Sequence, residues 1–516
     1  MSFWNYIKIK LFRNESGSLY FVPLLKFFFL LVFAGNYGLF RDEFYYIECS
    51  KHLAWGYVDQ PPLSLFILYV SRAVFGESIL GIRILSYAVS CGTVFISGLI
   101  AREMGGKKFS QILTQVCVVF SPVVLGGGSI YSMNSFDVFF AASAFYTLVK
   151  LIRTENLKLW LVFGIISGIG LQNKLSFLFI GFGTAVSLLL TKNRKYFLTK
   201  EIYIGALIAL IIFLPHLIWQ IQNGFPTIEF MRNAAERKNV RLGFAEFFVV
   251  SMMEMNPLYI ILLLAAGWFL FFDREGKRFS FLALTYLVVL TVFVLNHGKP
   301  YYMGILFPPM IAAGVVGADS FIERHLKRIG RIILLAILVP SFVIITPFAI
   351  PVLSIEGYIK YSETLGIKPP SQERLRSSIL PQFFADRFGW KEMAEKAGKA
   401  YNKLTDAEKK NAVIFAQNYG EAGALNYYSK EFGLPERIYS PHNSYWFWGP
   451  PAMDEKTVAI IVGSNLKDNG EWFEEVGLSE SHRNRYGMPY ENVDIFICRK
   501  IKIPIKTAWR ELKDFI

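Results

Sequence analysis

Long apolar runs alternate with short charged segments over the first two thirds of the chain. A helix needs about 20 apolar residues to cross a bilayer, and about eleven runs approach that length. They predict membrane-spanning helices over residues 19–40, 80–101, 109–126, 135–152, 158–173, 175–191, 201–219, 247–272, 279–295, 301–318 and 332–352. The pattern therefore predicts an α-helical polytopic membrane domain over residues 1–352.

The segments between these runs differ in charge. Every second segment is basic, and the positive-inside rule assigns basic segments to the cytoplasm. These segments contain Lys8, Lys10 and Arg13; Arg102, Lys107 and Lys108; Lys150, Arg153 and Lys158; Lys192, Arg194 and Lys195; Arg274, Lys277 and Arg278; and Arg324, Lys327, Arg328 and Arg331. An odd number of spans then places the C-terminal third outside. We expect a multi-pass inner-membrane protein with an extracytoplasmic C-terminal domain.

Two of the opposite, outer segments have unusual compositions. Residues 61–75 are apolar but short and begin with Pro61-Pro62, so they predict a helix lying along the membrane surface. Residues 220–246 break the positive-inside pattern with a cluster of cations, namely Arg232, Arg237, Lys238 and Arg241. Such a cluster is typical either of a site for an anionic head group or of a loop resting on anionic lipid.

The composition becomes that of a soluble protein after about residue 353. Helical spacing predicts helices over 390–404 and 421–432, and apolar runs predict strands over 411–417, 457–463 and 493–498. Gly433 is a stop signal for the second helix. Alternation of strands with helices predicts a small soluble α/β domain over residues 353–516.

Composition supports lipid as the solvent of the first part. The chain is 53% hydrophobic and 18% charged, against about a quarter charged in soluble proteins. Its net charge of +14 is explained by the cytoplasmic loops, and no nucleic-acid-binding motif is present. We therefore expect membrane lipid, and no nucleic acid, as a partner.

An acidic pair, Asp42-Glu43, follows the first predicted span, and Asp59-Gln60 ends the loop that it begins, within the outer segment of about residues 41–78. The pair could be a solvated interfacial feature. Its aromatic surroundings favour a pocket for a substrate with a lipid tail and a polar head. Sugar transfer from such a lipid needs a carboxylate as general base and cations for the leaving phosphate. Asp42 is the candidate base.

Further candidates lie at other outer ends of the predicted spans. Lys299 is a candidate phosphate partner, with Tyr301 and Tyr302 as hydroxyl donors, or else a lysine that snorkels to the interface. Asn134 and Asp137 begin a span, where they are either functional groups or helix caps. The remaining candidates for binding substrate are Lys174, between two spans, and Arg237 and His297 in outer loops. The sequence leaves open whether Asp42, Asp59 or His297 holds a divalent metal ion.

Several motifs together resemble a known superfamily. They are the acidic pair, Pro61-Pro62-Leu63, Ala101–Gly106 and Gly298–Tyr302, spread over about residues 20–320. The chain resembles the dolichyl-phosphate-mannose protein mannosyltransferases. More closely, it is similar to bacterial family-39-type glycosyltransferases, distant relatives of the lipid A aminoarabinose transferase. The segments Tyr419–Leu425 and His442–Gly449 also resemble the C-terminal domain of bacterial members.

The resemblance implies a GT-C fold and an inverting transfer from a polyprenyl-phosphate-linked sugar. The acceptor would be lipid A, another glycolipid, a cell-envelope glycan or a protein. Asp42 matches the catalytic aspartate and Glu43 its acidic neighbour, while a second outer aspartate aligns with Asn134 or Asp137. Asp59 and Gln60 replace a Glu-Lys pair of the lipid A branch, whose Glu is associated with a metal.

An alternative function is a transporter or flippase of lipid-linked sugars. Such a protein should carry charged residues along a path through the middle of the membrane. Glu254 is the most central acid of the predicted spans. The sequence offers little else of this kind, and the outer acidic cluster favours the enzyme.

Overall fold

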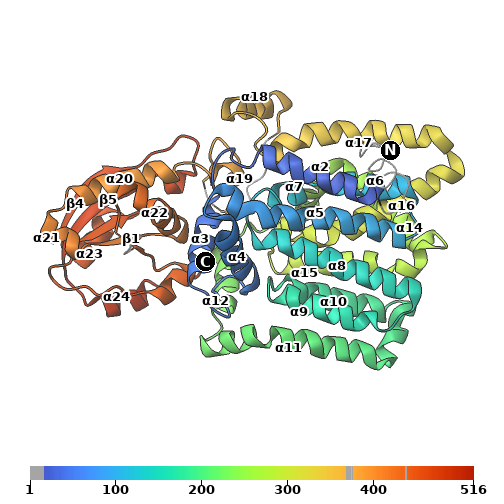
Figure 1. Ribbon diagram of the computed structural model, residues 1–516, viewed down its shortest axis with the longest axis horizontal. Helices are drawn as coiled ribbons and strands as arrows, with labels where there is room; N and C mark the ends of the chain where they lie inside the picture. Colours follow the sequence, from blue (N-terminus) through green and yellow to red (C-terminus); the bar gives the residue numbers. More distant parts are fainter. Residues whose placement is uncertain (1–16, 368–372, 375, 436–437) are drawn as a thin grey trace, which may run out of the picture.

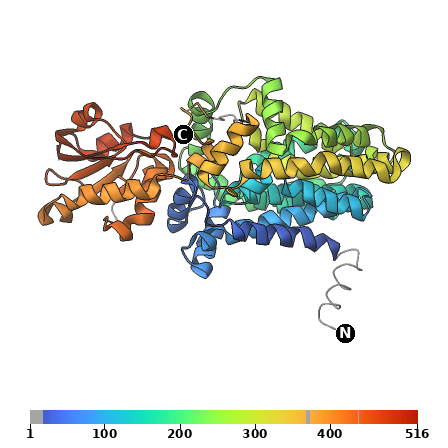
Figure 2. The ribbon, with the colours of Figure 1, turned by 90° about the horizontal axis from the view of Figure 1, so that it is seen from above.

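The computed structural model describes residues 17–367, 373–374, 376–435 and 438–516. A long helical bundle and a small α/β domain lie end to end in two perpendicular views (Figures 1 and 2). The predicted basic segment with Lys8, Lys10 and Arg13 lies outside the described residues.

The bundle contains apolar helices of very different lengths. They are α2 (Ser18–Val32), α5 (Ile79–Glu103), α6 (Lys108–Val119), α7 (Pro122–Gly127), α8 (Met133–Thr154), α9 (Leu159–Leu171), α10 (Ser176–Leu189), α11 (Lys200–Gln222), α13 (Phe244–Met255), α14 (Ile260–Phe272), α15 (Phe281–Leu295), α16 (Phe307–His325) and α17 (Lys327–Ala349). Within the described residues, six helical segments are long and apolar enough to span a membrane, or up to eight if two bent pairs are counted. The chain is a multi-pass membrane protein, but the predicted number of about eleven spans is not confirmed.

Two predicted spans are interrupted in the structure. Residues 247–272 form two helices bent by 108°, because Asn256 adopts a φ of 125° and Pro257 follows it. Asn256 Oδ1 then accepts a hydrogen bond of 3.1 Å from Leu258 N. Residues 109–126 are also interrupted, because α6 ends at Val119 and α7 begins at Pro122. A proline inside either run lacks the N–H that a continuous helix requires.

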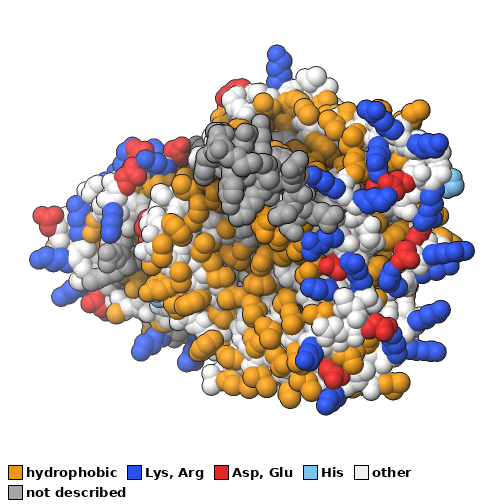
Figure 3. All heavy atoms as spheres, turned by 45° about the vertical axis from the view of Figure 1, so that its right-hand side comes forward, with side chains coloured by type: hydrophobic (Ala, Val, Ile, Leu, Met, Phe, Trp, Pro, Cys, Tyr) orange, Lys and Arg blue, Asp and Glu red, His pale blue; other side chains and the backbone are white. Residues whose placement is uncertain are grey.

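The two ends of the bundle differ in charge. Figure 3 shows a broad hydrophobic surface over the helices, with Lys and Arg side chains gathered at the end farther from the α/β domain. The other end carries α3 (Arg41–Lys51), α4 (Leu63–Phe75) and α12 (Pro226–Asn233) (Figure 1). Helix α4 is the short apolar helix predicted over residues 61–75, and its Phe66 and Val74 are 52% and 66% exposed. These exposed apolar side chains suit contact with lipid.

The C-terminal region is an α/β domain around a mixed five-stranded sheet of order β2-β1-β3-β5-β4. The strands are β1 (Val413–Ala416), β2 (Ile438–Tyr439), β3 (Ala459–Val462), β4 (Phe473–Ser481) and β5 (Asp494–Ile501). The helices are α18 (Ile355–Leu365), α19 (Gln382–Ala385), α20 (Trp390–Asn402), α21 (Asp406–Lys410), α22 (Tyr419–Phe432), α23 (Leu466–Trp472) and α24 (Ile505–Glu511). The predicted helices correspond to α20 and α22, and the predicted strands to β1, β3 and β5. Strand β4 was missed because most of its residues are exposed and give no apolar run.

One hydrophobic core joins the α/β domain to the outer end of the bundle. Phe44 of α3 and Leu65 of α4 belong to the same buried cluster as Ile414 of β1 and Ala422 and Leu425 of α22. Full burial of a side chain such as Phe or Leu contributes about 1.5–3 kcal/mol. The domain is therefore packed firmly onto α3, the helix that begins with the predicted catalytic acid.

Candidate active site

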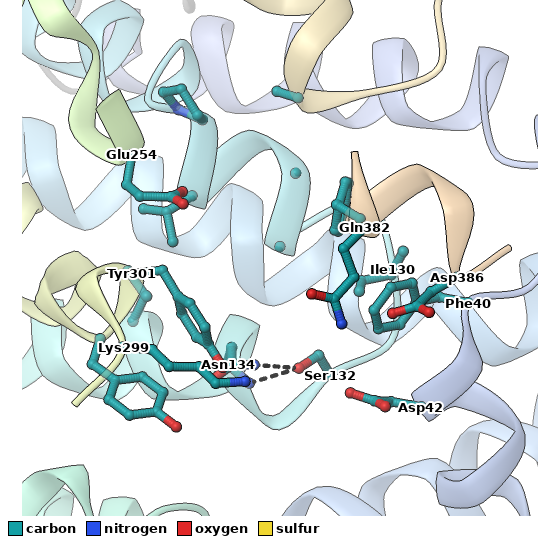
Figure 4. A pocket seen from close by; sticks show the side chains of 18 of the residues that line it. Phe40, Asp42, Ile130, Ser132, Asn134, Glu254, Lys299, Tyr301, Gln382 and Asp386 are labelled. Atoms are coloured by element: carbon teal, nitrogen blue, oxygen red, sulfur yellow. Dashed lines mark hydrogen bonds between the residues drawn. The ribbon is translucent and has the colours of Figure 1, made fainter. Parts of the chain in front are cut away.

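A cavity of about 290 Å³ lies where α3, α19 and the ends of the bundle helices nearest the α/β domain meet (Figure 1). Figure 4 shows Lys299 and Tyr301 reaching in from one side, with Asp42 and Asp386 on the other. The polar lining consists of Arg41, Asp42, Ser132, Asn134, Asp137, Lys174, Glu254, Lys299, Tyr301, Tyr302, Glu373, Gln382 and Asp386. Most residues predicted to bind substrate from the bundle side thus meet in one space.

Asp42 stands in the first turn of α3, where the helix dipole favours a negative charge. Its Oδ1 accepts a hydrogen bond of 2.9 Å from the Tyr419 hydroxyl and lies 3.6 Å from Arg41 Nε. The side chain is 32% exposed, so the carboxylate is neither sealed in the protein nor neutralised by a close ion pair. A carboxylate in this position can accept a proton from a group bound in the cavity.

Glu43, the neighbouring acid, has the opposite environment. Its side chain is fully buried, and its two oxygens lie 2.7 and 2.6 Å from Arg83 Nε and Nη2. The same oxygens accept hydrogen bonds of 2.7 Å from the backbone N–H groups of Tyr131 and Phe40. Glu43 does not line the cavity. These contacts fit a group that fixes the start of α3 rather than one that touches substrate.

Lys174 gathers a second polar cluster at the outer ends of the bundle helices. Its Nζ donates a hydrogen bond of 2.6 Å to Asn134 Oδ1 and lies 3.6 Å from Asp137 Oδ2. It also lies 4.4 Å from the centroid of the Tyr302 ring, within range of a cation–π interaction. Asn134 and Asp137 therefore hold the same lysine, as their spacing of three residues on one helix face allows.

Lys299 also lines the cavity but has a carboxylate partner. Its Nζ lies 2.5 Å from Glu373 Oε1, and Lys238 Nζ lies 3.9 Å from the same atom. Burial works against ionisation of Glu373, but the two lysines outweigh it and hold the pKa of Glu373 well below its usual range. Burial lowers the pKa of Lys238 to about 8, with Glu373 opposing that shift.

Besides Glu43, four predicted site residues do not line this cavity. Asp59 is buried and accepts a hydrogen bond of 2.8 Å from the Tyr45 hydroxyl, and burial raises its pKa to about 6. Gln60 is fully buried, and its amide finds no hydrogen-bond partner among the described residues. Arg237 pairs with Asp514 at the surface, and the backbone oxygen of His297 accepts a bond from Asn239. Their binding of substrate stays a prediction.

Comparisons with known proteins agree with this architecture. The family model for dolichyl-phosphate-mannose-protein mannosyltransferase matches residues 59–219. The chain is 24% identical, over 46% of its length and 51% of the relative, to the lipid A galacturonosyltransferase RgtD of Rhizobium johnstonii. It is 25% identical, over 62% and 63% of the two chains, to the undecaprenyl phosphate-α-4-amino-4-deoxy-L-arabinose arabinosyl transferase of Pseudomonas savastanoi. The chain thus spans about half to two thirds of these curated relatives.

A solved structure covers far more of the chain. ArnT from Cupriavidus metallidurans, bound to undecaprenyl phosphate, superposes on 93% of this chain and 97% of its own, with a TM-score of 0.59 and 12% identity. This chain has the GT-C fold. The family model and the relatives confirm the resemblance drawn from the sequence, and the solved structure confirms the expected fold.

Within the GT-C fold, several cavity residues had not been predicted as site residues. Arg41 is buried beside Asp42, its Nη1 is 3.9 Å from Asp386, and its guanidinium lies 5.4 Å from the Tyr419 ring centroid. Burial raises the pKa of Asp386 to about 6, although Arg41 opposes that rise. The position of Arg41 next to the acidic pair was a usable signal, whereas Asp386 and Glu373 lie in a region without any recognised motif.

The residues of this GT-C site do not fit a protein-bound metal. Among the described residues, no group of three His, Cys, Asp or Glu side chains is placed to hold one. Asp59 occupies the place of the metal-associated Glu of the lipid A branch, but it is buried and bound to Tyr45. The open suggestion of a metal at Asp42, Asp59 or His297 gains no support from this donor set, and the mechanism below uses none.

Proposed function

We propose that the chain is a membrane glycosyltransferase that moves a sugar from a polyprenyl-phosphate carrier to an acceptor hydroxyl. The observation that carries the proposal is the cavity, in which Asp42 lies across from Lys299 and which Lys174 also lines (Figure 4). A general base on one side and cations on the other match the two charges that develop when a glycosyl phosphate is attacked.

In the proposed reaction the acceptor oxygen attacks the anomeric carbon while Asp42 takes its proton. The bond between that carbon and the phosphate oxygen breaks, and its electron pair stays on the carrier phosphate. One displacement of this kind inverts the anomeric configuration. Glu43 does not take part directly, and instead holds α3 through its pairing with Arg83.

The leaving phosphate is stabilised by Lys174 and Lys299, with the hydroxyls of Tyr301 and Tyr302 as further donors. Neither lysine is bound by a bidentate partner, so an incoming phosphate can replace or share its present contacts. Charge-assisted hydrogen bonds of this kind are about twice as strong as neutral ones.

The carrier lipid is proposed to enter along the apolar wall of the same cavity, formed by residues such as Val123, Ile305 and Phe348. Glu254, the central acid on which a transporter would depend, lines this cavity too and marks the end remote from Asp42 (Figure 4). No separate charged path is therefore needed to account for it, and the enzyme is the reading that we support.

The relatives' names support a glycolipid such as lipid A as acceptor, ahead of another envelope glycan or a protein. We further propose that residues 1–352 form the catalytic membrane domain in the inner membrane. The α/β domain, residues 353–516, would then face outward. The cationic end of the bundle, which lies away from that domain, supports this orientation.

The test is sugar transfer in liposomes that contain the purified protein, a panel of polyprenyl-phosphate sugars and an envelope glycolipid extract. Asp42→Asn keeps the size of the side chain but removes the base, so transfer should fall by about 10²–10⁴-fold. Glu48→Gln is the matched control, because Glu48 is a buried acid on the same helix that pairs with Lys51 and does not line the cavity.

Each possible outcome of this test leads to a different conclusion. Transfer lost with Asp42→Asn and kept within about twofold with Glu48→Gln would support the assignment. Equal loss in both variants would point to damage of α3 instead. Unchanged transfer in Asp42→Asn would reject Asp42 as the base, and a product with retained anomeric configuration would reject the single displacement.

A further inference from the structure

We infer that Tyr419 is a positioning residue for Asp42, so that the α/β domain completes the active site of the bundle. This inference rests on the proposed function, in which Asp42 is the base. Tyr419 begins α22, nearly 380 residues after Asp42 in the sequence, and its hydroxyl donates a hydrogen bond of 2.9 Å to Asp42 Oδ1. It is the contact that joins the second domain directly to the candidate catalytic group.

The Tyr419 ring is itself held in place from several sides. Its centroid lies 4.7 Å from that of Tyr45 and 4.8 Å from that of His442. Its backbone N–H points to His442 Nδ1 at 3.3 Å. A side chain with only 7% of its surface exposed and two packed ring neighbours has little freedom to rotate. The hydroxyl is therefore a fixed reference point for the carboxylate.

Asp42 needs such a reference because Arg41 competes for it. The Arg41 Nε lies 3.6 Å from Asp42 Oδ1 and has no hydrogen-bond partner among the described residues. A carboxylate that is 32% exposed can rotate between staggered positions. Rotation toward Arg41 would form a close ion pair and turn the base away from the acceptor. The Tyr419 hydroxyl opposes this rotation by occupying Oδ1, which leaves Oδ2 for the acceptor proton.

The sequence around Tyr419 contains two glycines that allow the close approach of α22 to α3 on which the hydrogen bond between Tyr419 and Asp42 depends. A Cβ at Gly423 would lie 2.8 Å from the Phe44 carbonyl carbon, and one at Gly420 would lie 2.5 Å from Arg41 Cγ. Glycine at both positions lets the backbone of α22 approach α3 more closely than any other residue would allow. The Tyr-Gly-Glu-Ala-Gly pattern thus combines the hydroxyl with the close helix contact that delivers it.

The first arm of the test compares two tyrosines of the same helix. Tyr419→Phe removes only the hydroxyl, and kcat should fall by about 10- to 30-fold while KM for the carrier changes less than twofold. Tyr427→Phe is the control, because the Tyr427 hydroxyl also joins α22 to the bundle, through Glu77 O at 3.2 Å, but touches no catalytic group. Its kcat should stay within about twofold of wild type.

The second arm does not depend on activity. Thermal unfolding is measured for Tyr419→Phe, Asp42→Ala and the double variant. If the two side chains bind each other, the loss of Tm in the double variant is smaller than the sum of the single losses. Tyr427→Phe combined with Asp42→Ala should give additive losses.

Each result decides one question. Non-additive Tm losses together with a fall of kcat confined to Tyr419→Phe support the inference. Additive losses overturn the contact, whatever the activity. Coupled Tm with unchanged kcat, or an equal fall of kcat in Tyr427→Phe, overturns the positioning role and leaves only domain docking. Transfer that survives Asp42→Asn rejects the proposed base, a failure that the stability cycle separates from loss of the contact itself.

Discussion

The two walls of the cavity are built in different ways. On the bundle side, Lys174, Asn134 and Asp137 come from the outer ends of helices that pack against each other inside the bundle. On the α3 side, Asp42 and Arg41 are held by Tyr419, Asp386 and Tyr490, all from the C-terminal region. The contacts of Lys174 thus come from the bundle, whereas the candidate base depends on the C-terminal region, as Lys299 does through Glu373.

Helix α3 is the element where these two constructions meet. Glu43 ties it to α5 of the bundle through a buried ion pair with Arg83. Phe44, the next residue, packs against α22, where Gly423 admits its backbone. Adjacent residues therefore anchor α3 to different domains. A substitution at either anchor can displace Asp42, but the two kinds of substitution should differ in their effects on unfolding temperature and on transfer.

The largest effect is expected from breaking the bundle anchor. Arg83→Met leaves Glu43 buried without its partner, and loss of one member of a buried pair costs about 3–5 kcal/mol. The unfolding temperature in detergent should fall clearly, with transfer falling beside it. Restoring neutrality with Glu43→Gln in the same chain should recover part of the loss. A double variant no more stable than Arg83→Met would show that charge burial is not the cause.

The second effect concerns the phosphate side, and the unfolding temperature is measured beside transfer because Asp137 is buried next to Lys174. Lys174→Met removes a cavity cation that we propose to stabilise the leaving phosphate, and transfer should fall by about 10²-fold. Lys174→Arg should recover part of that activity because it keeps the charge. Lys195→Met is the control, since Lys195 forms an exposed pair with Glu155 that contributes little. The measurement is the rate of sugar transfer in liposomes. Equal rates in Lys174→Met and wild type would contradict a role of Lys174 in stabilising the leaving phosphate.

The third effect tests the domain anchor without touching a polar group. Gly423→Ala places a methyl group 2.8 Å from the Phe44 carbonyl carbon, so α22 must move away from α3. Overpacking of this kind costs about 1–3 kcal/mol, and the Tyr419 bond to Asp42 should lengthen. Transfer and unfolding temperature should both fall. Gly470→Ala on α23 has free space around it and should change neither. Wild-type transfer in Gly423→Ala would indicate that the contact tolerates a shift.

The bundle side of the site was largely predictable from sequence because local rules place it. Polar residues at the outer ends of apolar runs must converge when the helices pack, which brought Asn134, Lys174 and Lys299 to one cavity. The acidic pair illustrates the limit of such rules. Asp42 and Glu43 are adjacent acids in the sequence, and their tertiary contacts separate them, since Glu43 pairs with Arg83 and Asp42 accepts a hydrogen bond from Tyr419.

The domain side could not be predicted, because its contacts join residues hundreds of positions apart. Nothing in the local sequence of Asp386 or Tyr419 indicates which helix of the bundle each will meet. The predicted number of spans is not confirmed for a different reason. Hydropathy measures apolar length, but the breaks at Asn256 and Pro122 arise from backbone geometry inside continuous apolar runs.

The smallest effect is expected in the pH dependence of the stability of the α/β domain. Burial raises the pKa of Glu491 to about 7, with Arg41 opposing, and burial together with the charge of Glu491 raises the pKa of Glu421. The folded protein therefore keeps a proton that the unfolded chain releases near pH 4.3. Stability from this proton is fully present below that pH and is lost as pH rises through about 7.

Glu491→Gln removes this dependence because the amide is neutral throughout. At pH 8 the variant should be more stable than wild type by about 1–3 kcal/mol, and its unfolding temperature should change less between pH 5 and pH 8. Glu395→Gln, in an exposed pair with Lys399, should keep the wild-type slope. Parallel curves for wild type and Glu491→Gln would contradict the shared buried proton. A changed pH dependence of the unfolding temperature, with unaltered transfer at pH 5, would show that the substitution alters the stability of the domain without disturbing the hydrogen bond between Tyr419 and Asp42.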